Sequence, residues 1–198
     1  AQPNVFTKKI IESMCAFNPR PVVFALSNPT SKAECTAAQA YEWSKGAAVF
    51  ASGTLFAPVT YKGTKFAPGF ANNAFIFPGV AAGSLASGVS SVTDGMFLAA
   101  ARSLASRVSE ENLAVGAVYP PTSTIREAAV GVGATVAAAA AAEGVAASGA
   151  CRGGLIPGRN GAAGTRVPSL DALTGGEGGE GACANWEACV RDYLKTCL

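Results

Sequence analysis

The sequence predicts an α/β fold in which a partial parallel sheet is flanked by helices. Two short apolar runs, residues 21–26 and 47–52, lack the polar alternation of a half-exposed strand, which is typical of strands in a parallel sheet. A stretch of helical character separates them, so that the three segments form a βαβ unit with a right-handed crossover. Twelve of the 23 glycines lie between Gly144 and Gly181, and this change in composition predicts a flexible glycine-rich C-terminal tail.

Composition excludes several classes of protein. The 198 residues carry a formal net charge of +2 and 14% of them are charged, with lysine and arginine scattered, so that no nucleic-acid partner is expected. No apolar run reaches the ~18 residues that cross a bilayer, which predicts no membrane partner. Histidine is absent and the six cysteines form no C-x-x-C pair, so that the sequence offers neither a histidine base nor a zinc site.

The start of the chain carries neither a methionine nor a recognisable signal peptide. We interpret it as a cleaved or partial chain of a soluble intracellular protein, in the cytoplasm or an organelle matrix, whose cysteines stay reduced.

The first predicted element is an amphipathic helix over residues 6–17. Thr7 is expected to cap its start, since a threonine hydroxyl accepts hydrogen bonds from the free amide groups of the first turn. Its buried stripe comprises Ile10, Ile11, Met14 and Cys15. Pro19 and Pro21 then end the helix and lead into the first strand, which we expect to be buried on both faces.

A second helix is expected over residues 34–43, with a C-terminal stop at the Lys-Gly pair 45–46. After the second strand, residues 59–66 are predicted to form a small hairpin that turns near the Lys-Gly pair 62–63.

Three further helices are expected in the second half of the chain. They cover residues 81–88, residues 94–108 with Thr93 as the cap, and residues 123–143. The last of these is rich in alanine, and each of the two glycines inside it lowers its helix propensity by about 1 kcal/mol. Residues 112–121 are interpreted as a connection that ends at two prolines.

The predicted domain organisation has three parts. Residues 1–143 form the folded α/β portion, residues 144–185 form the flexible tail, and residues 186–198 form a possible short terminal helix. Two parallel strands are too few for a complete nucleotide-binding sheet, and no G-x-G-x-x-G motif follows a strand. The folded portion is therefore predicted to be the later part of a larger α/β domain.

Polar residues follow the first predicted strand at Ser27 and Asn28, on the rim where open α/β sheets bind ligands. Two interpretations stay open for Asn28, which either closes an Asx-type turn before Pro29 or faces a ligand. The pair Asn72 and Asn73 precedes an apolar run, where asparagine is first of all a helix-start signal.

Three motifs carry a resemblance to a known family in both order and spacing. They are FALSNPTSKAECT at 24–36, FASG at 50–53 and NNAFIFPG at 72–79. With YPP at 119–121, they closely resemble malic enzymes, and the similarity runs from about residue 6 to about residue 143. The resemblance implies a Rossmann-like fold and an enzyme that oxidises L-malate with NAD or NADP and decarboxylates the product to pyruvate and CO2, using Mg²⁺ or Mn²⁺. It also implies a homo-oligomer when the enzyme is full length.

The resemblance also implies site residues. Asn28, Asn72 and Asn73 correspond to substrate-binding positions, and Ser27, Asn28 and Asn73 to cofactor-binding positions. Amide side chains suit these roles, because they offer a donor and an acceptor without adding charge beside a hydride-transfer centre. Of the asparagine pair, we expect one to face the ligand and one to be structural, with Asn73 preferred as the direct contact.

The sequence departs from the family pattern at two places beside these residues. Thr54-Leu55-Phe56 stands where the family usually has S-P-F, and Gly69-Phe70-Ala71 stands where it usually has G-Q-G. Ala71 would be strained if its backbone needed a positive φ.

No position matches the family's tyrosine acid, lysine base, acidic metal ligands, malate-binding arginine or glycine-rich turn. The charged residues nearest the motifs are interpreted as helix-start or surface residues; they are Lys32, Glu34, Glu42 and Asp94. We therefore expect no catalytic residue and no metal ligand in this chain, which would be one wall of the pocket and inactive by itself. The alternative is a truncated, non-catalytic binding or interaction module of the same ancestry.

Overall fold

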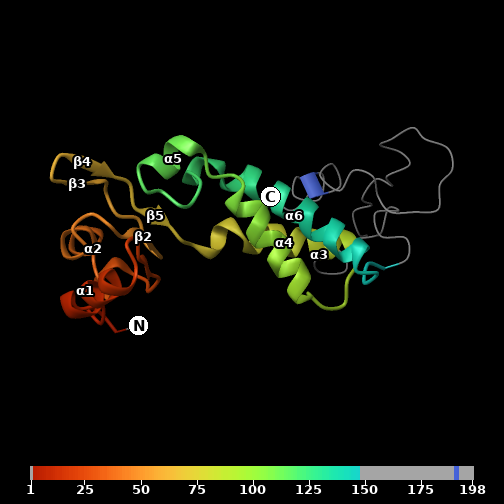
Figure 1. Ribbon diagram of the computed structural model, residues 1–198. Coiled ribbons are helices and arrows are strands. Elements are labelled where there is room, and N and C mark those ends of the chain that lie inside the picture. Colours follow the sequence, from red (N-terminus) through yellow and green to blue (C-terminus); the bar gives the residue numbers. More distant parts are fainter. Residues whose placement is uncertain (1, 148–189, 192–198) are drawn as a thin grey trace. The chain divides into compact units, whose positions relative to one another are not determined.

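The computed structural model describes residues 2–147 and 190–191, and these form two compact units. Of the described residues, the first unit combines 2–73 with Ala105–Ile125, and the second combines Ala74–Leu104 with 126–147 and 190–191. Figure 1 shows both units and labels most of their helices and strands. The predicted folded portion, residues 1–143, is described except for residue 1, whereas the predicted tail over residues 144–185 lies outside the described residues beyond residue 147. Of the predicted terminal helix only Val190 and Arg191 are described, and both are helical.

The first unit is an α/β arrangement. Its elements are α1 (Lys8–Phe17), β1 (Val22–Ala25), α2 (Ala37–Trp43), β2 (Val49–Ser52), β3 (Val59–Tyr61), β4 (Thr64–Phe66), β5 (Gly69–Phe70) and α5 (Glu110–Ala114), with the 3₁₀ turns η1 (Thr30–Lys32) and η3 (Thr122–Thr124). The 3₁₀ turn η2 (Asn73–Phe75) begins at the last residue of this segment and continues into the second unit. The predicted βαβ unit is confirmed as β1–α2–β2, with Val22 opposite Val49 and Ala25 opposite Ser52 in parallel register.

A third strand was missed in the sequence. The two-residue strand β5 pairs in parallel with β2 and places Gly69 opposite Ala51, so that the sheet order is β1-β2-β5. Two residues are too short a run for a periodicity signal. Full burial of the first strand is also wrong, because β1 lies at one edge of this sheet, and the side chains of Val22 and Leu26 are 56% and 52% exposed.

Aromatic side chains link the sheet to the hairpin β3–β4. The rings of Tyr41 and Phe66 stack at a centroid distance of 4.4 Å, and Tyr41 meets Phe50 edge-on at 6.0 Å. Around them lies the apolar core of the unit: Ile11, Val23, Ala25, Cys35, Ala37, Ala40, Ala48 and Phe50. The predicted turn of the hairpin is confirmed, since Lys62 and Gly63 both have a positive φ (48° and 82°), the geometry of a tight hairpin turn.

Helix boundaries in this unit follow from capping. Thr7 caps α1 as predicted, and its hydroxyl accepts a hydrogen bond from the amide of Ile10. Ile10, expected in the buried stripe, is 44% exposed, and only Ile11 on this helix is fully buried. The predicted start of the second helix is wrong by three residues, because Thr36 forms a capping box with Gln39 and α2 begins at Ala37.

The second unit is helical. It contains α3 (Phe77–Ser87), α4 (Asp94–Ala105) and the greater part of α6 (Ile125–Ala142). Thr93 caps α4 as predicted, accepting from the amide of Met96 at 3.1 Å. The core consists of Met96, Ala100, Val132, Val136 and Ala140.

Two predicted boundaries in the second half are wrong. α3 begins four residues earlier than expected, at Phe77, because Pro78 occupies a position in the first turn where its missing amide costs nothing. The predicted connection 112–121 is partly helical, since Ser109 caps the short helix α5.

Glycines let α3 and α6 approach closely. A methyl group at Gly79 would lie 2.7 Å from the Cβ of Val132, and one at Gly83 would lie 2.4 Å from the carbonyl oxygen of Gly133. These distances leave no room for a side chain. Gly133, one of the two glycines that lower the helix propensity of α6, therefore lies where α6 contacts α3.

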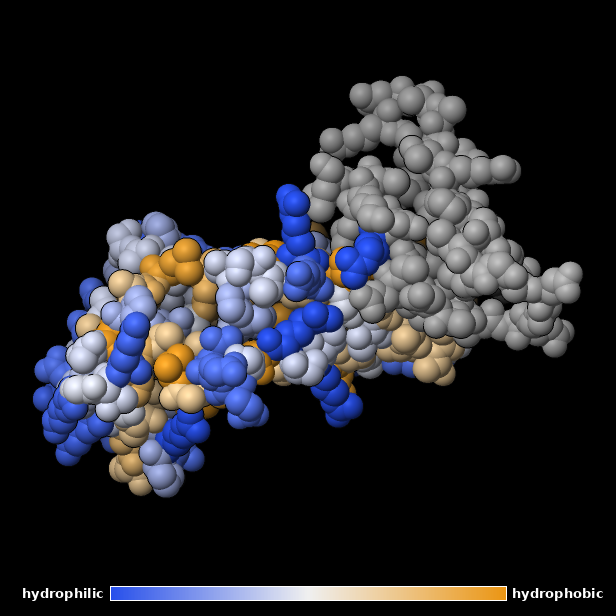
Figure 2. Space-filling view, turned by 90° about the horizontal axis from the view of Figure 1, so that it is seen from above, coloured by the Kyte–Doolittle hydropathy of each residue, from blue (hydrophilic) through white to orange (hydrophobic). Residues whose placement is uncertain are grey.

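α6 and the turn before it are long and apolar. Thr122–Ala142 has 21 residues and contains an 18-residue window with a mean hydropathy of 1.3, so that by length and composition alone it is a candidate to cross a membrane. Half of this window is buried inside the structure, and the core helices of soluble proteins pass the same test. Figure 2 shows apolar side chains on one face of the molecule among polar ones.

Candidate functional site

Three chain segments meet at Gly53, just beyond the carboxyl end of β2. The amide of Gly53 donates a hydrogen bond to the carbonyl oxygen of Ala25 at 2.9 Å. A methyl group at Gly53 would lie 2.2 Å from the carbonyl oxygen of Leu26, so that the end of β1 can approach only a glycine here. Gly53 is thus the close-packing point at the rim of the sheet.

Two of the predicted site asparagines lie against this glycine. The side-chain nitrogen of Asn28 is 3.3 Å from the position that a Gly53 Cβ would occupy. The side-chain nitrogen of Asn72 donates a hydrogen bond to the carbonyl oxygen of Gly53 at 3.4 Å. The parallel pairing of β2 with β1 on one side and with β5 on the other brings these residues, 44 positions apart in the sequence, to one place.

The asparagine pair divides in its environment. Asn72 is half-buried and bonded to the backbone, whereas Asn73 is exposed and begins the 3₁₀ turn η2. Which of the two faces a ligand, expected from the sequence to be Asn73, stays a prediction. Asn28 is also exposed, and its peptide bond to Pro29 is cis.

Ser27 has a partner that the sequence interpretation missed. Its amide donates to Oε2 of Glu34 at 3.2 Å, and its hydroxyl donates to Oε1 of the same carboxylate. Partial burial by itself would raise the pKa of the Glu34 carboxyl, but these hydrogen bonds outweigh it and hold that pKa below its ordinary value. Glu34, expected at a helix start or on the surface, is half-buried and lies before α2.

Aromatic residues support the sheet near the site. The ring of Tyr119 lies 6.2 Å from that of Phe24, and Tyr119 Cδ2 is 3.4 Å from the Cβ position of Gly69. Burial raises the pKa of the Tyr119 phenol. Tyr119 belongs to the YPP motif, and its position beside β1 and β5 explains why an aromatic residue stands there.

The departure at Ala71 leaves the backbone unstrained. Ala71 has no positive φ, and its amide donates to the carbonyl oxygen of Ser52 at 2.8 Å, which continues the pairing of β2 and β5. The alanine therefore causes no backbone strain at this position.

The described residues offer no metal site. Within residues 2–147 and 190–191, no three histidine, cysteine, aspartate or glutamate side chains lie close enough together to hold an ion. Mg²⁺ and Mn²⁺ need several oxygen ligands, so the residues present do not fit a resident metal.

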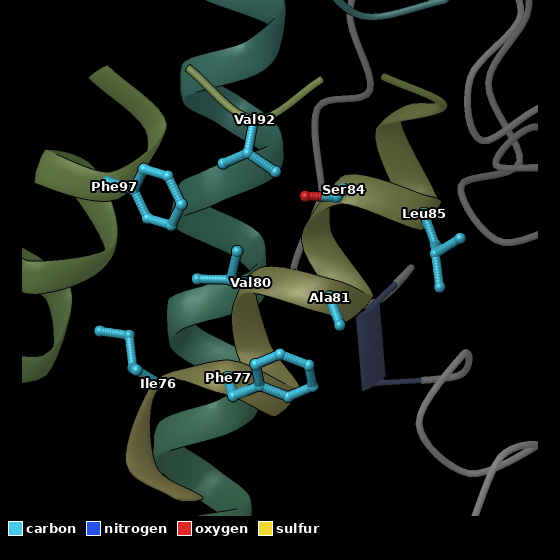
Figure 3. A pocket seen from close by; sticks show the side chains of 8 residues that line it. All are labelled: Ile76, Phe77, Val80, Ala81, Ser84, Leu85, Val92 and Phe97. Carbon is cyan, nitrogen blue, oxygen red and sulfur yellow. The ribbon is translucent and has the colours of Figure 1, made fainter. Parts of the chain in front are cut away.

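A separate pocket lies in the second unit (Figure 3). It has a volume of about 480 Å³ and is lined by Ile76, Phe77, Val80, Ala81, Ser84, Leu85, Val92 and Phe97. Phe97 comes from α4 and most of the others from α3. The lining is apolar apart from Ser84 and includes no charged side chain.

Comparison with known proteins gives consistent matches. Residues 1–141 match the family model described as malic enzyme, NAD binding domain. An NADP-dependent malic enzyme from Populus trichocarpa is 55% identical over 135 residues, which cover 68% of this chain and 23% of that protein. A chloroplastic NADP-dependent malic enzyme from Zea mays is 51% identical over 132 residues, covering 67% of this chain and 21% of that protein.

Solved structures agree with the sequence comparison. The crystal structure of the Entamoeba histolytica malic enzyme superposes with a TM-score of 0.56 at 26% identity, covering 74% of this chain and 26% of that one. The predicted Rossmann-like fold class is confirmed by this neighbour and by the parallel sheet. The chain spans about a quarter of the length of the relatives that it matches.

Proposed function

The chain belongs to the malic enzyme family, as part of its NAD-binding domain, and we propose that it supplies one wall of the nicotinamide and malate pocket of a larger enzyme. That enzyme oxidises L-malate with a nicotinamide nucleotide and decarboxylates the product to pyruvate and CO2. The observation that carries the proposal is the convergence of Asn28 and Asn72 on Gly53, at the carboxyl end of a parallel sheet.

The three asparagines have different roles in this proposal. Asn28 and Asn73, both exposed, face the ligands. Their amide nitrogens donate to a malate carboxylate or to the carboxamide oxygen of nicotinamide, and their carbonyl oxygens accept from the carboxamide nitrogen. Asn72, through its hydrogen bond to Gly53, holds the segment that carries Asn73. Neutral amides fix the orientation of both reactants without a charge that would bias hydride transfer.

Ser27 contributes to the same wall from within the loop. Its hydroxyl proton is committed to Glu34, so that only its oxygen lone pairs are available to a cofactor.

The nucleotide is NAD or NADP, and the names of the plant relatives, all NADP-dependent, support NADP. When bound, it accepts the hydride from malate. The Mg²⁺ or Mn²⁺ of the family finds no ligands among the described residues, so that no step through a metal is assigned to this chain.

The working enzyme is proposed to be a homo-oligomer in a soluble compartment. Relatives from Zea mays and Oryza sativa are named chloroplastic, which supports an organelle as one possible location beside the cytoplasm.

A chimera tests the proposal. In the Populus NADP-dependent malic enzyme, the segment of 135 matched residues is replaced by that of this chain, and malate-dependent NADPH production is measured. We expect turnover from the chimera and none from the 198-residue chain alone. In the chimera, Asn28→Ala should raise KM for malate about tenfold or more, since a hydrogen bond to a charged group is worth ~1.5–3 kcal/mol.

Asn18→Ala is the matched control, because Asn18 is exposed in the same unit and caps α1 through its backbone alone. If the chimera is active but Asn28→Ala and Asn73→Ala have no more effect than this control, the assignment of Asn28 and Asn73 as ligand-binding residues is refuted. A chimera that folds but has no activity would favour the non-catalytic module.

A further inference from the structure

The loop that carries Asn28 is closed by its own hydrogen bonds. Within it, the amide of Lys32 donates to the carbonyl oxygen of Pro29 at 2.8 Å, and the amide of Ala33 donates to that of Thr30 at 3.1 Å. These two bonds shape the turn η1 but do not reach Ser27. The contact that joins the two ends of the loop is the one between Ser27 and Glu34.

Glu34 is itself held firmly. Its carbonyl oxygen accepts a hydrogen bond from the amide of Phe6 at 3.0 Å, and the neighbouring carbonyl of Ala33 accepts from the amide of Asn4 at 3.2 Å. The next residue, Cys35, is 1% exposed and belongs to the core of the unit. The backbone that carries the carboxylate is therefore fixed, and the carboxylate is a fixed point for the opposite end of the loop.

Capping of α2 does not explain this carboxylate. Thr36 and Gln39 already form the capping box at the start of that helix. Both carboxylate oxygens of Glu34 accept instead from Ser27, one from its amide and one from its hydroxyl. A carboxylate is the side chain that accepts two such bonds at once, and bonds to an ionised acceptor are about twice as strong as neutral ones.

We propose that Glu34 is a positioning residue for Asn28: its carboxylate fixes the backbone of Ser27 and so holds the Asn28 amide against Gly53. The proposal rests on the proposed function for its catalytic consequence, but the hydrogen bonds themselves can be measured without it. In this proposal Glu34 acts on Asn28 through the loop, by its hydrogen bonds to Ser27.

The hydrogen bonds are tested in the 198-residue chain by NMR. In Glu34→Ala we expect the amide proton of Ser27 to exchange with solvent about tenfold faster or more and its resonance to move upfield, as a charge-assisted bond is lost. Glu34→Gln, which keeps the size and one acceptor oxygen, should fall between Glu34→Ala and the unchanged chain. Glu42→Gln, an exposed acid on the neighbouring helix, is the control and should leave Ser27 unchanged.

The action through Asn28 is tested in the chimera by a double-mutant cycle. Glu34→Ala should raise KM for malate, with kcat changed less, and the double variant Glu34→Ala with Asn28→Ala should be no worse than Asn28→Ala alone. Glu34→Gln should restore part of the loss.

Two results would overturn the inference. One is a Ser27 amide whose exchange and resonance do not respond to Glu34→Ala or Glu34→Gln. The other is a cycle in which the effects of Glu34→Ala and Asn28→Ala on KM for malate multiply, because Glu34 would then act independently of Asn28. If Asn28→Ala alone leaves KM unchanged, the proposed function fails, and the NMR result still decides whether Glu34 holds the loop.

Discussion

Replacing Gly53 by alanine gives the sharpest test of the geometry at the sheet rim, because its added methyl meets backbone. The methyl would lie 2.2 Å from the carbonyl oxygen of Leu26 and 2.8 Å from its carbonyl carbon. Neither atom can move without displacing the end of β1, whose register with β2 is fixed by four residue pairs. Forcing a methyl into a packed site costs ~1–3 kcal/mol, and we expect the upper part of this range.

Gly95→Ala is the instructive comparison. A methyl there would lie even closer to a neighbour, 1.9 Å from Oε1 of Glu143, but that neighbour is the end of an exposed, flexible side chain. Alanine in a helix gains up to ~1 kcal/mol over glycine, and moving the carboxylate loses at most the exposed bond from Thr93 to Glu143, also about 1 kcal/mol. The two variants should therefore differ by about 2–3 kcal/mol in unfolding free energy.

The assay is urea unfolding of the full chain, followed by tryptophan fluorescence. Trp43 packs on the core of the first unit, and replacing the other tryptophan, Trp186→Phe, leaves it as the single reporter. With a slope of ~1–3 kcal/mol per molar urea, Gly53→Ala should lower the midpoint by about 1 M. Circular dichroism at 222 nm follows Gly95→Ala, whose midpoint should be unchanged. Equal midpoints for Gly53→Ala and the parent chain would refute the close approach of β1 and β2 at this point.

Two further predictions concern ionisable groups of the first unit. The pKa of the Glu34 carboxyl lies below its ordinary value of 4.5, so that its hydrogen bonds stabilise the folded chain above pH 4.5, and this stabilisation is lost as the pH falls through the lower folded pKa. The urea midpoint should therefore fall more steeply below pH 4.5 in the parent chain than in Glu34→Gln. Parallel pH curves for the two chains would contradict this. Burial, with a smaller contribution from the charge of Glu34, raises the pKa of the Cys35 thiol to about 11. Iodoacetamide should therefore modify Cys35 only after the chain unfolds, as measured by peptide mass spectrometry. Rapid labelling of the native chain would contradict the burial of this thiol.

Local signals predicted the elements whose causes are local. Thr7 and Thr93 could be identified as caps because a single hydroxyl satisfies free amides within three residues. The hairpin turn could be placed because a Lys-Gly pair tolerates the positive φ that a tight turn needs. Apolar runs identified β1 and β2 as strands of a parallel sheet, but not which of them lay at the edge.

Features that depend on tertiary contacts were missed. The strand β5 exists only because β2 presents a free edge to Gly69 and Phe70, and two residues carry no periodicity of their own. Glu34 looked like a helix-start acid, and its pairing with Ser27 became visible only once the loop was closed in space. For Gly133 the sequence showed a loss of helix propensity, whereas the structure shows close contact with α3.

The departures from the family pattern bear differently on the proposed site. Ala71 takes the place of a glycine without a positive φ and keeps its hydrogen bond to Ser52, so that the segment leading to Asn72 retains its course along β2. Phe70, within β5, takes the place of the glutamine that the family usually has. This substitution removes a hydrogen-bond donor and an acceptor near the asparagines. Since the backbone at Ala71 is unstrained and a polar side chain is missing at Phe70, we expect the wall to keep its shape while depending more heavily on Asn28 and Asn73. Restoring the amide with Phe70→Gln in the chimera would then lower KM for malate rather than raise kcat, because the change adds binding and leaves the reacting groups untouched.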